Sequence, residues 1–160
     1  MKTVVFAAVL AALMLQPAPA VDDMIERLAT CQISWRDWKN DPVQSQKAAA
    51  LFKGVLINPA PDGSFTPKEK VLVVGLPVLQ VYPESVGMGV GFSVVLGASF
   101  DTARDHVQKA TGKTLTDCDT SDGMRTCGLE VATERTIALM AAENAKDART
   151  LLGCYYLYVK

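Results

Sequence analysis

Apolar residues recur at helical spacing near the beginning of the chain. Met24, Leu28, Cys31, Trp35 and Trp38 follow one another at intervals of three or four residues, which places them on one face of a helix. Acidic residues gather at the start of this stretch, where the helix dipole favours negative charge. The pattern predicts a first helix over residues 22–38.

A second helix is predicted to follow, over residues 42–54. Asp41 followed by Pro42 is typical of a helix cap and first helical position, and Gly54 marks the expected end. The apolar stripe of this helix consists of Ala48, Leu51, Phe52 and Val55. A turn-rich loop over residues 59–67 then separates the helical pair from the rest of the chain.

Beyond residue 70 the pattern changes to short apolar and β-branched runs, which are typical of strands. One helix interrupts them: Ser99 is its predicted N-cap, Gly112 its predicted end, and its stripe contains Phe100, Ala103, Val107 and Ala110. Strands are expected over residues 71–74, 78–82, 90–96, 115–118, 126–132, 135–142 and 150–159, with Pro77 kinking or dividing the first of them.

The order of these elements favours antiparallel pairing, because consecutive strands are joined by short turns. The sequence therefore predicts an α+β fold in which two N-terminal helices and one mid-chain helix pack on one face of a mainly antiparallel sheet.

Residues 1–20 have the pattern of a secretory signal peptide. Lys2 precedes an apolar run from Val4 to Leu15, and Ala18-Pro19-Ala20 forms a small-residue cleavage site before Val21. The alternative is a membrane anchor, but the run is about 12 residues long and a bilayer requires roughly 20. We therefore expect a cleaved signal peptide (1–20) and a single periplasmic or secreted domain (21–160) that does not stay inserted in a membrane.

Charge excludes one large class of partner. The chain has 16 basic and 17 acidic residues, a formal net charge of −1, and its lysines and arginines are dispersed. Proteins that bind nucleic acid by its phosphate backbone concentrate basic residues on one surface. No nucleic-acid partner is expected.

All four cysteines lie beyond residue 20, and an even number in an exported chain predicts two disulfides. Cys118 and Cys127 flank Asp122-Gly123, a strong turn signal, so they can face each other across a hairpin. This leaves Cys31 to pair with Cys154.

The second bridge would gather aromatic residues. Tyr156 and Tyr158 share a strand face with Cys154, so a bond to Cys31 brings them toward Trp35 and Trp38. We interpret this cluster as core. The alternative is an exposed aromatic platform for a sugar ring or a partner's side chain.

Residues for enzymatic chemistry are sparse. His106 is the sole histidine, and neither a Gly-x-Ser-x-Gly turn nor a Cys-x-x-Cys motif is present, which disfavours nucleophilic hydrolysis and structural zinc. Asp101 and Asp105 belong to an expected solvated helix face. Asp117 and its neighbours do not follow the register of a calcium loop. No catalytic residue, metal or cofactor is predicted.

Alternating glycines at 87, 89 and 91 predict a bend at which another backbone comes close. The loop before this bend is a candidate for recognition of a partner. Its predicted contact residues are Glu84, Ser85, Val86 and Met88.

Export, two disulfides and the scarcity of catalytic residues favour a non-enzymatic binding protein, specifically an inhibitor or immunity-type protein that binds another exported or envelope protein. Three alternatives stay open. A small-molecule or glycan carrier would use a hollow between sheet and helices, lined by the aromatic cluster. A carboxylate-dependent hydrolase would need two acidic side chains to converge, and a structural envelope protein would need neither.

Overall fold

The computed structural model describes residues 21–57, 59–83, 90–144 and 149–156. Its helices are α1 (Val21–Ala29), α2 (Trp35–Asn40), α3 (Pro42–Val55) and α4 (Phe100–Thr111). Its strands are β1 (Leu72–Val73), β2 (Leu76–Tyr82), β3 (Val90–Leu96), β4 (Asp117–Ser121), β5 (Met124–Ala132), β6 (Arg135–Ala142) and β7 (Thr150–Tyr156).

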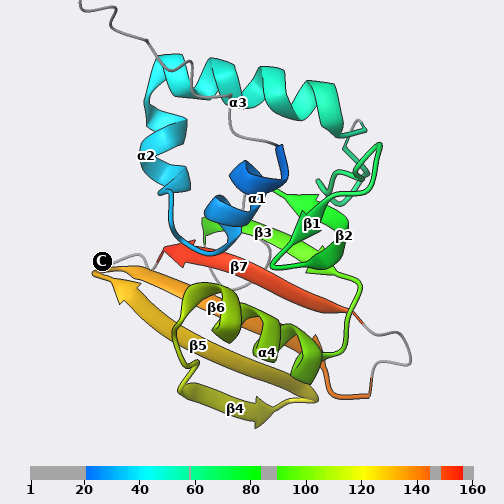
Figure 1. The fold of residues 1–160 in the computed structure, drawn as a ribbon, viewed down its shortest axis with the longest axis vertical. Helices are drawn as coiled ribbons and strands as arrows, with labels where there is room; N and C mark the ends of the chain where they lie inside the picture. The colour runs from blue at the N-terminus through cyan, green and yellow to red at the C-terminus, as the bar shows by residue number, and fades with distance from the viewer. Residues whose placement is uncertain (1–20, 58, 84–89, 145–148, 157–160) are drawn as a thin grey trace, which may run out of the picture.

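The strands form one seven-stranded sheet in the order β1-β2-β3-β7-β6-β5-β4, and every neighbouring pair is antiparallel (Figure 1). The last described strand, β7, therefore lies at the centre, between β3 and β6. This confirms the predicted mixed fold with an antiparallel sheet.

Helices α1 and α4 cover the same face of this sheet (Figure 1). Phe92, Cys154 and Ile137 lie side by side across β3, β7 and β6, and all three are buried. Because side chains alternate along each strand, the neighbours two residues away point to the same face and continue the core. Helix α1 packs against β1, β3 and β7, and α4 packs against β6.

The prediction of one continuous helix over residues 22–38 is wrong. Helix α1 ends at Ala29, and Cys31 has a φ of 59°, which a right-handed helix cannot accommodate. The amides of Gln32 and Ile33 both donate to the carbonyl oxygen of Arg27, at 2.8 and 3.0 Å, and close the end of α1. Helix α2 then starts anew, with Ser34 Oγ accepting from the amide of Asp37 at 3.1 Å. Three helices, rather than two, thus precede the sheet in the described chain.

The strand predicted over residues 71–74 is also shorter than expected. Val74 and Gly75 both have positive φ, 49° and 79°, and form the tight turn between β1 and β2. Pro77 lies inside β2, opposite Leu72, and does not divide two strands.

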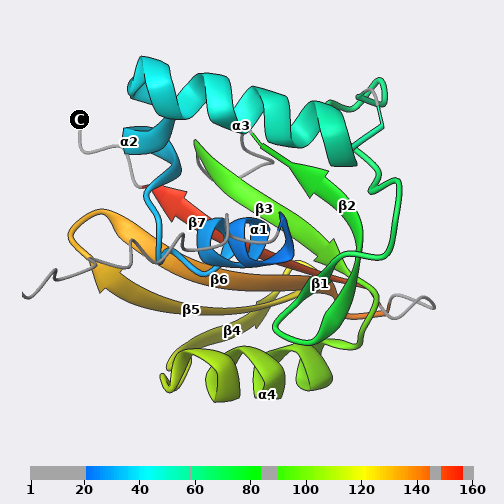
Figure 2. The ribbon, with the colours of Figure 1, turned by 45° about the horizontal axis from the view of Figure 1, so that its top comes forward.

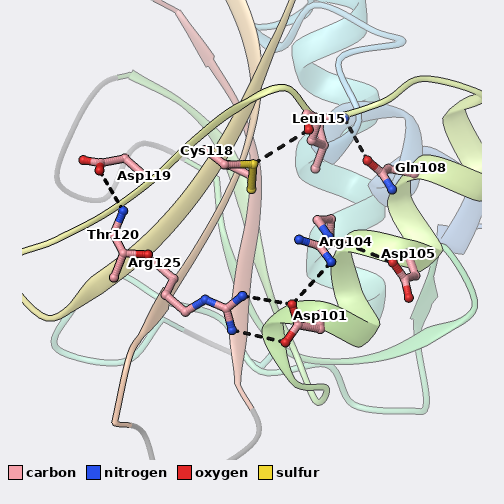
Figure 3. Close-up of a disulfide and its surroundings, with 10 residues drawn as sticks. Asp101, Arg104, Asp105, Gln108, Leu115, Cys118, Asp119, Thr120 and Arg125 are labelled. Atoms are coloured by element: carbon pink, nitrogen blue, oxygen red, sulfur yellow. Dashed lines mark hydrogen bonds and ion pairs between the residues drawn. A yellow bond between two sulfur atoms is a disulfide. The ribbon is translucent and has the colours of Figure 1, made fainter.

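Helix α4 begins and ends as predicted. Ser99 Oγ accepts from the amide of Thr102 at 3.4 Å, and Gly112 ends the helix with a φ of 65°. An additional contact holds α4 to the sheet, because Arg125 of β5 donates to both carboxylate oxygens of Asp101, at 2.9 and 3.2 Å (Figure 3). The guanidinium of Arg125 also lies 4.4 Å from the centroid of the Phe100 ring. The hydrogen bonds from Arg125 lower the pKa of Asp101.

Both disulfides join the predicted pairs. Cys118 and Cys127 lie directly opposite each other in the β4–β5 hairpin, whose turn contains Asp122 and Gly123 at positive φ. Cys31 and Cys154 connect the segment after α1 to the central strand. Disulfides persist outside the reducing cytoplasm, so the two bridges indicate an extracellular or periplasmic location. The predicted signal peptide lies outside the described residues.

Among the four described helices, none combines the length and the hydropathy that a membrane span requires.

Candidate functional site

An open groove of about 980 Å³ lies between α3 and the segment that follows it. Its buried lining consists of Trp35, Phe52 and Leu56, and the partly exposed Phe65 lies on the opposite side. The lining is mainly apolar. The other described residues that contribute are Lys39, Ser45, Ala49, Lys53, Ile57, Pro59, Gly63, Lys68 and Pro83. Figure 2 shows α3 alongside β2 and β3, with the segment from residue 56 onward turning back at its C-terminal end.

Backbone hydrogen bonds fix the segment that forms the second wall of the groove. The amide of Ile57 donates to the carbonyl oxygen of Thr66 at 2.8 Å, so the chain folds back on itself after α3. Phe65 and Val81 exchange two further bonds of 2.8 Å, which attach this wall to β2. The apolar side chains are therefore held on a backbone whose polar groups are paired.

Aromatic packing makes the inner wall rigid. The ring centroids of Trp35 and Phe52 are 5.9 Å apart, and both rings contact Phe92, at 5.5 and 6.0 Å. Trp38 completes the cluster at 5.5 Å from Trp35. Phe92 is fully buried on β3, so the inner wall of the groove is a direct extension of the core.

The residues of the predicted aromatic cluster do not share one location in the structure. Trp35 and Trp38 are buried in the core, and Trp35 alone of the two lines the groove. Tyr156 is buried beside the long disulfide, and its hydroxyl donates to Ser34 Oγ at 3.3 Å. Tyr158 lies outside the described residues. Phe52 and Phe92, which the sequence analysis did not assign to the cluster, are the partners of the two tryptophans.

Three lysines, Lys39, Lys53 and Lys68, form the charged part of the groove, which we call the lysine rim. The ammonium of Lys68 donates to the carbonyl oxygens of Lys53 and Gly54, at 2.9 and 3.4 Å, which holds it at the C-terminal end of α3. The described lining contains no aspartate or glutamate.

Asp62 is the acidic residue beside Gly63 in the outer wall, but its carboxylate is engaged elsewhere. It accepts from the amide and hydroxyl of Ser64, at 2.9 and 2.7 Å, and from the hydroxyl of Tyr82 at 3.2 Å. The hydrogen bonds from Ser64 lower the pKa of Asp62 below its ordinary 3.8. Burial, followed by the charge of Asp62, raises the pKa of Tyr82 above its ordinary 10.0.

We expect NMR titration of the carboxyl groups to show a pKa for Asp62 below 3.8, and Ser64→Ala to move it back toward that value. The pKa of Asp62 is lower in the folded state than in the unfolded state. The hydrogen bonds to its carboxylate therefore stabilise the folded state above the unfolded-state pKa. This stabilisation is lost as the pH falls through the folded-state pKa. Tyr82→Phe should change the pKa of Asp62 less, since Tyr82 is a smaller cause. An unshifted pKa in the unmodified protein would contradict the arrangement of this turn.

Other residues singled out in the sequence do not join the groove. The predicted contact residues Glu84, Ser85, Val86 and Met88 lie outside the described residues, although Pro83, where that loop begins, lines the groove. His106 Nδ1 lies 2.9 Å from the carbonyl oxygen of Val74 and so supports the β1–β2 turn. In the described ranges, no three histidine, cysteine or acidic side chains gather as a metal site.

The outer wall of the groove was not foreseen, because it comes from the turn-rich segment that was interpreted as a loop. One signal was available. Leu56, Ile57 and Phe65 are large apolar residues within an otherwise polar and proline-rich stretch. Such residues in a connecting segment need a surface to pack against.

No known protein family, curated protein or solved structure shows significant similarity to this chain.

Proposed function

We propose that this chain is an exported, non-enzymatic binding protein and that the groove is its binding site. The observation that supports the proposal is the groove's size and lining. Its volume of about 980 Å³ lies at the upper end of the range of small-molecule sites, roughly 300–1,000 Å³. Mainly apolar walls with a few polar groups are typical of such sites.

The contacts that hold the two walls of the groove favour its interpretation as a binding site rather than as a gap left by imperfect packing. Aromatic contacts and paired backbone groups hold both walls before any ligand arrives, which reduces the ordering cost of association. The described lining offers no histidine, cysteine or carboxylate. Of the residue types that often act as general acids, bases or nucleophiles, the described lining contains lysine and Ser45, and the hydroxyl of Ser45 donates to the carbonyl oxygen of Pro42 at 3.3 Å.

The experiment compares Ala49→Trp with Ala50→Trp. Both alanines are exposed on α3, but Ala49 lines the groove and Ala50 does not. The probe is N-phenyl-1-naphthylamine, a neutral apolar dye that fluoresces when it leaves water. We expect saturable fluorescence with the unmodified protein. Ala49→Trp should lower the affinity for the dye by about tenfold or more, because the indole occupies the groove, and Ala50→Trp should change it little.

Urea denaturation of both variants checks that they fold equally well. Unsaturable dye fluorescence in the unmodified protein, or equal losses in the two variants, would rule out the groove as a binding site.

Recognition of another protein, as an inhibitor or immunity-type protein, is the second form that this function can take. It is favoured by the open groove, whose mainly apolar lining includes the half-exposed Ile57, since contiguous apolar surface that is open to solvent marks protein contacts. This form would be supported by capture of an envelope hydrolase or toxin, identified by mass spectrometry, that also binds as a purified protein. Its binding should be lost in Ala49→Trp and kept in Ala50→Trp.

A further inference from the structure

We infer that the groove binds a monomeric long-chain carboxylate, with its alkyl chain along the aromatic wall and its carboxylate beside Lys53 and Lys68 of the lysine rim. This inference rests on the proposed function, because it names the class of ligand for the same groove. It follows from the way in which apolar surface and positive charge are combined there.

The apolar part of the groove suits an alkyl chain. The buried side chains of Trp35, Phe52 and Leu56 and the half-buried Phe65 provide apolar surface from two separate elements of the wall. Ala49 lies in the same lining and leaves space above the helix surface. Each methylene group that such a surface removes from water strengthens binding by about fourfold.

The charged part of the groove suits an anion. Lys39 comes from α2, Lys53 from the last turn of α3 and Lys68 from the segment beyond it, so three elements bring positive charge to one site. The described lining residues include neither an aspartate nor a glutamate. Asp62, the acidic residue beside the lining, already accepts hydrogen bonds from Ser64 and Tyr82.

The position of Lys68 adds direction to this charge. Its ammonium donates to the carbonyl oxygens of Lys53 and Gly54, at 2.9 and 3.4 Å, so the charge of Lys68 lies at the C-terminal end of α3, where Lys53 also lines the groove. The aromatic wall extends from there toward Trp35 on α2. A ligand with an apolar body and one anionic end matches this arrangement, whereas a neutral apolar ligand leaves the lysine rim unused.

A free monomer fits better than a lipid surface. The apolar side chains lie between two walls, α3 on one side and the segment around Phe65 on the other. A single chain can enter such a groove, but a planar bilayer would contact its edges only.

The test is displacement of N-phenyl-1-naphthylamine by three amphiphiles with the same chain: dodecanoate, dodecyl maltoside and dodecyltrimethylammonium, each below its micelle concentration. We expect dodecanoate to displace the dye at concentrations about tenfold lower than the neutral and cationic amphiphiles require. Tetradecanoate should bind more tightly than decanoate by about tenfold or more.

Lys53→Gln together with Lys68→Gln should remove most of the preference for dodecanoate. The affinity for the dye is measured first in each variant, and displacement by dodecanoate is then compared with displacement by dodecyl maltoside in that same variant. The matched control is Lys109→Gln with Lys113→Gln, two exposed lysines near the end of α4 that do not line the groove. Because Lys68 also holds the end of α3, Lys53→Gln alone serves as a second variant. It should lower the preference for dodecanoate by about threefold.

Three results would overturn the inference. If the dye binds and all three amphiphiles displace it equally well, the groove is an apolar binding site without preference for an anion. The proposed function would then stand. Cosedimentation with phosphatidylglycerol vesicles that dodecanoate does not inhibit would assign the lysine rim to a membrane surface. A dye that never binds would refute the proposed function itself.

Discussion

Replacing both Cys31 and Cys154 with alanine is expected to lower the free energy of unfolding by about 5 kcal/mol. The bridge closes a separation of 123 residues, so it removes a large part of the conformational freedom of the unfolded chain. Single domains of ordinary stability have about 5–15 kcal/mol in total, and this variant should therefore be marginal or unfolded at 37 °C. Urea denaturation monitored by tryptophan fluorescence measures the loss.

The backbone at Cys31 helps to isolate the contribution of the bridge. Cys31 has a φ of 59°, and alanine is strained there to a similar degree, so that strain largely cancels in the comparison. The reference variant replaces Cys118 and Cys127, whose separation is 9 residues, and should lose about 2–3 kcal/mol. Equal losses in the two variants would show that loop length does not govern the stabilisation.

Gly91→Ala is expected to destabilise the protein by about 3 kcal/mol or more. A Cβ atom at this position would overlap the carbonyl oxygen of Cys154 and approach Tyr155 Cα to 3.1 Å. Both are backbone atoms of β7, which lies between β3 and β6 and is tied to the N-terminal segment by the long disulfide. Backbone atoms cannot move to another rotamer as a side chain can, so strand β3 or β7 must shift to make room for the Cβ atom.

The control for this glycine is Gly54→Ala on α3, where no heavy atom of the described residues, apart from the chain neighbours and the helix's own backbone, lies within 4 Å of the added Cβ. Alanine favours the helix over glycine, so this variant should gain about 0.5–1 kcal/mol. Thermal unfolding of the two variants beside the unmodified protein gives both signs in one experiment. Unfolding of Gly91→Ala at the same temperature as the unmodified protein would contradict the pairing of β3 with β7.

Local sequence signals predicted the elements whose ends are chemically marked. Ser99 and Gly112 delimit α4 as expected, and the strands over residues 90–96 and 135–142 have the predicted bounds. Asp122-Gly123 places Cys118 opposite Cys127 because a tight turn fixes the register of its hairpin. In each case the residues that decide the outcome are close together in the sequence.

The helix break at Cys31 could not be predicted from local sequence signals. The spacing from Met24 to Trp38 is helical throughout, yet the chain turns at Cys31, which is bonded to Cys154 with 5.0 Å between their Cα atoms. Cys154 lies on a distant strand, so the cause of the break is tertiary. Periodicity reports which residues share a face and does not report a turn that a remote contact imposes.

The candidate site was predictable only in general terms. A hollow bordered by Trp35 was expected, but the other expected lining residues, Trp38 and Tyr156, are buried in the core. The outer wall depends on the pairing of Phe65 with Val81, two residues from segments with no shared pattern. Long-range pairing of this kind is what composition and spacing do not encode.

The central position of β7 has a consequence for the order in which the chain can assemble. Strands β1, β2 and β3 pair among themselves, as do β4, β5 and β6, and in the described sheet β7 alone joins the two groups. During synthesis, Cys118 and Cys127 can meet in their hairpin while β7 has not yet been made, whereas Cys31 must wait for Cys154. A chain that ends before residue 150 would therefore contain two separate half-sheets, each with one additional unpaired edge, β3 in the first and β6 in the second.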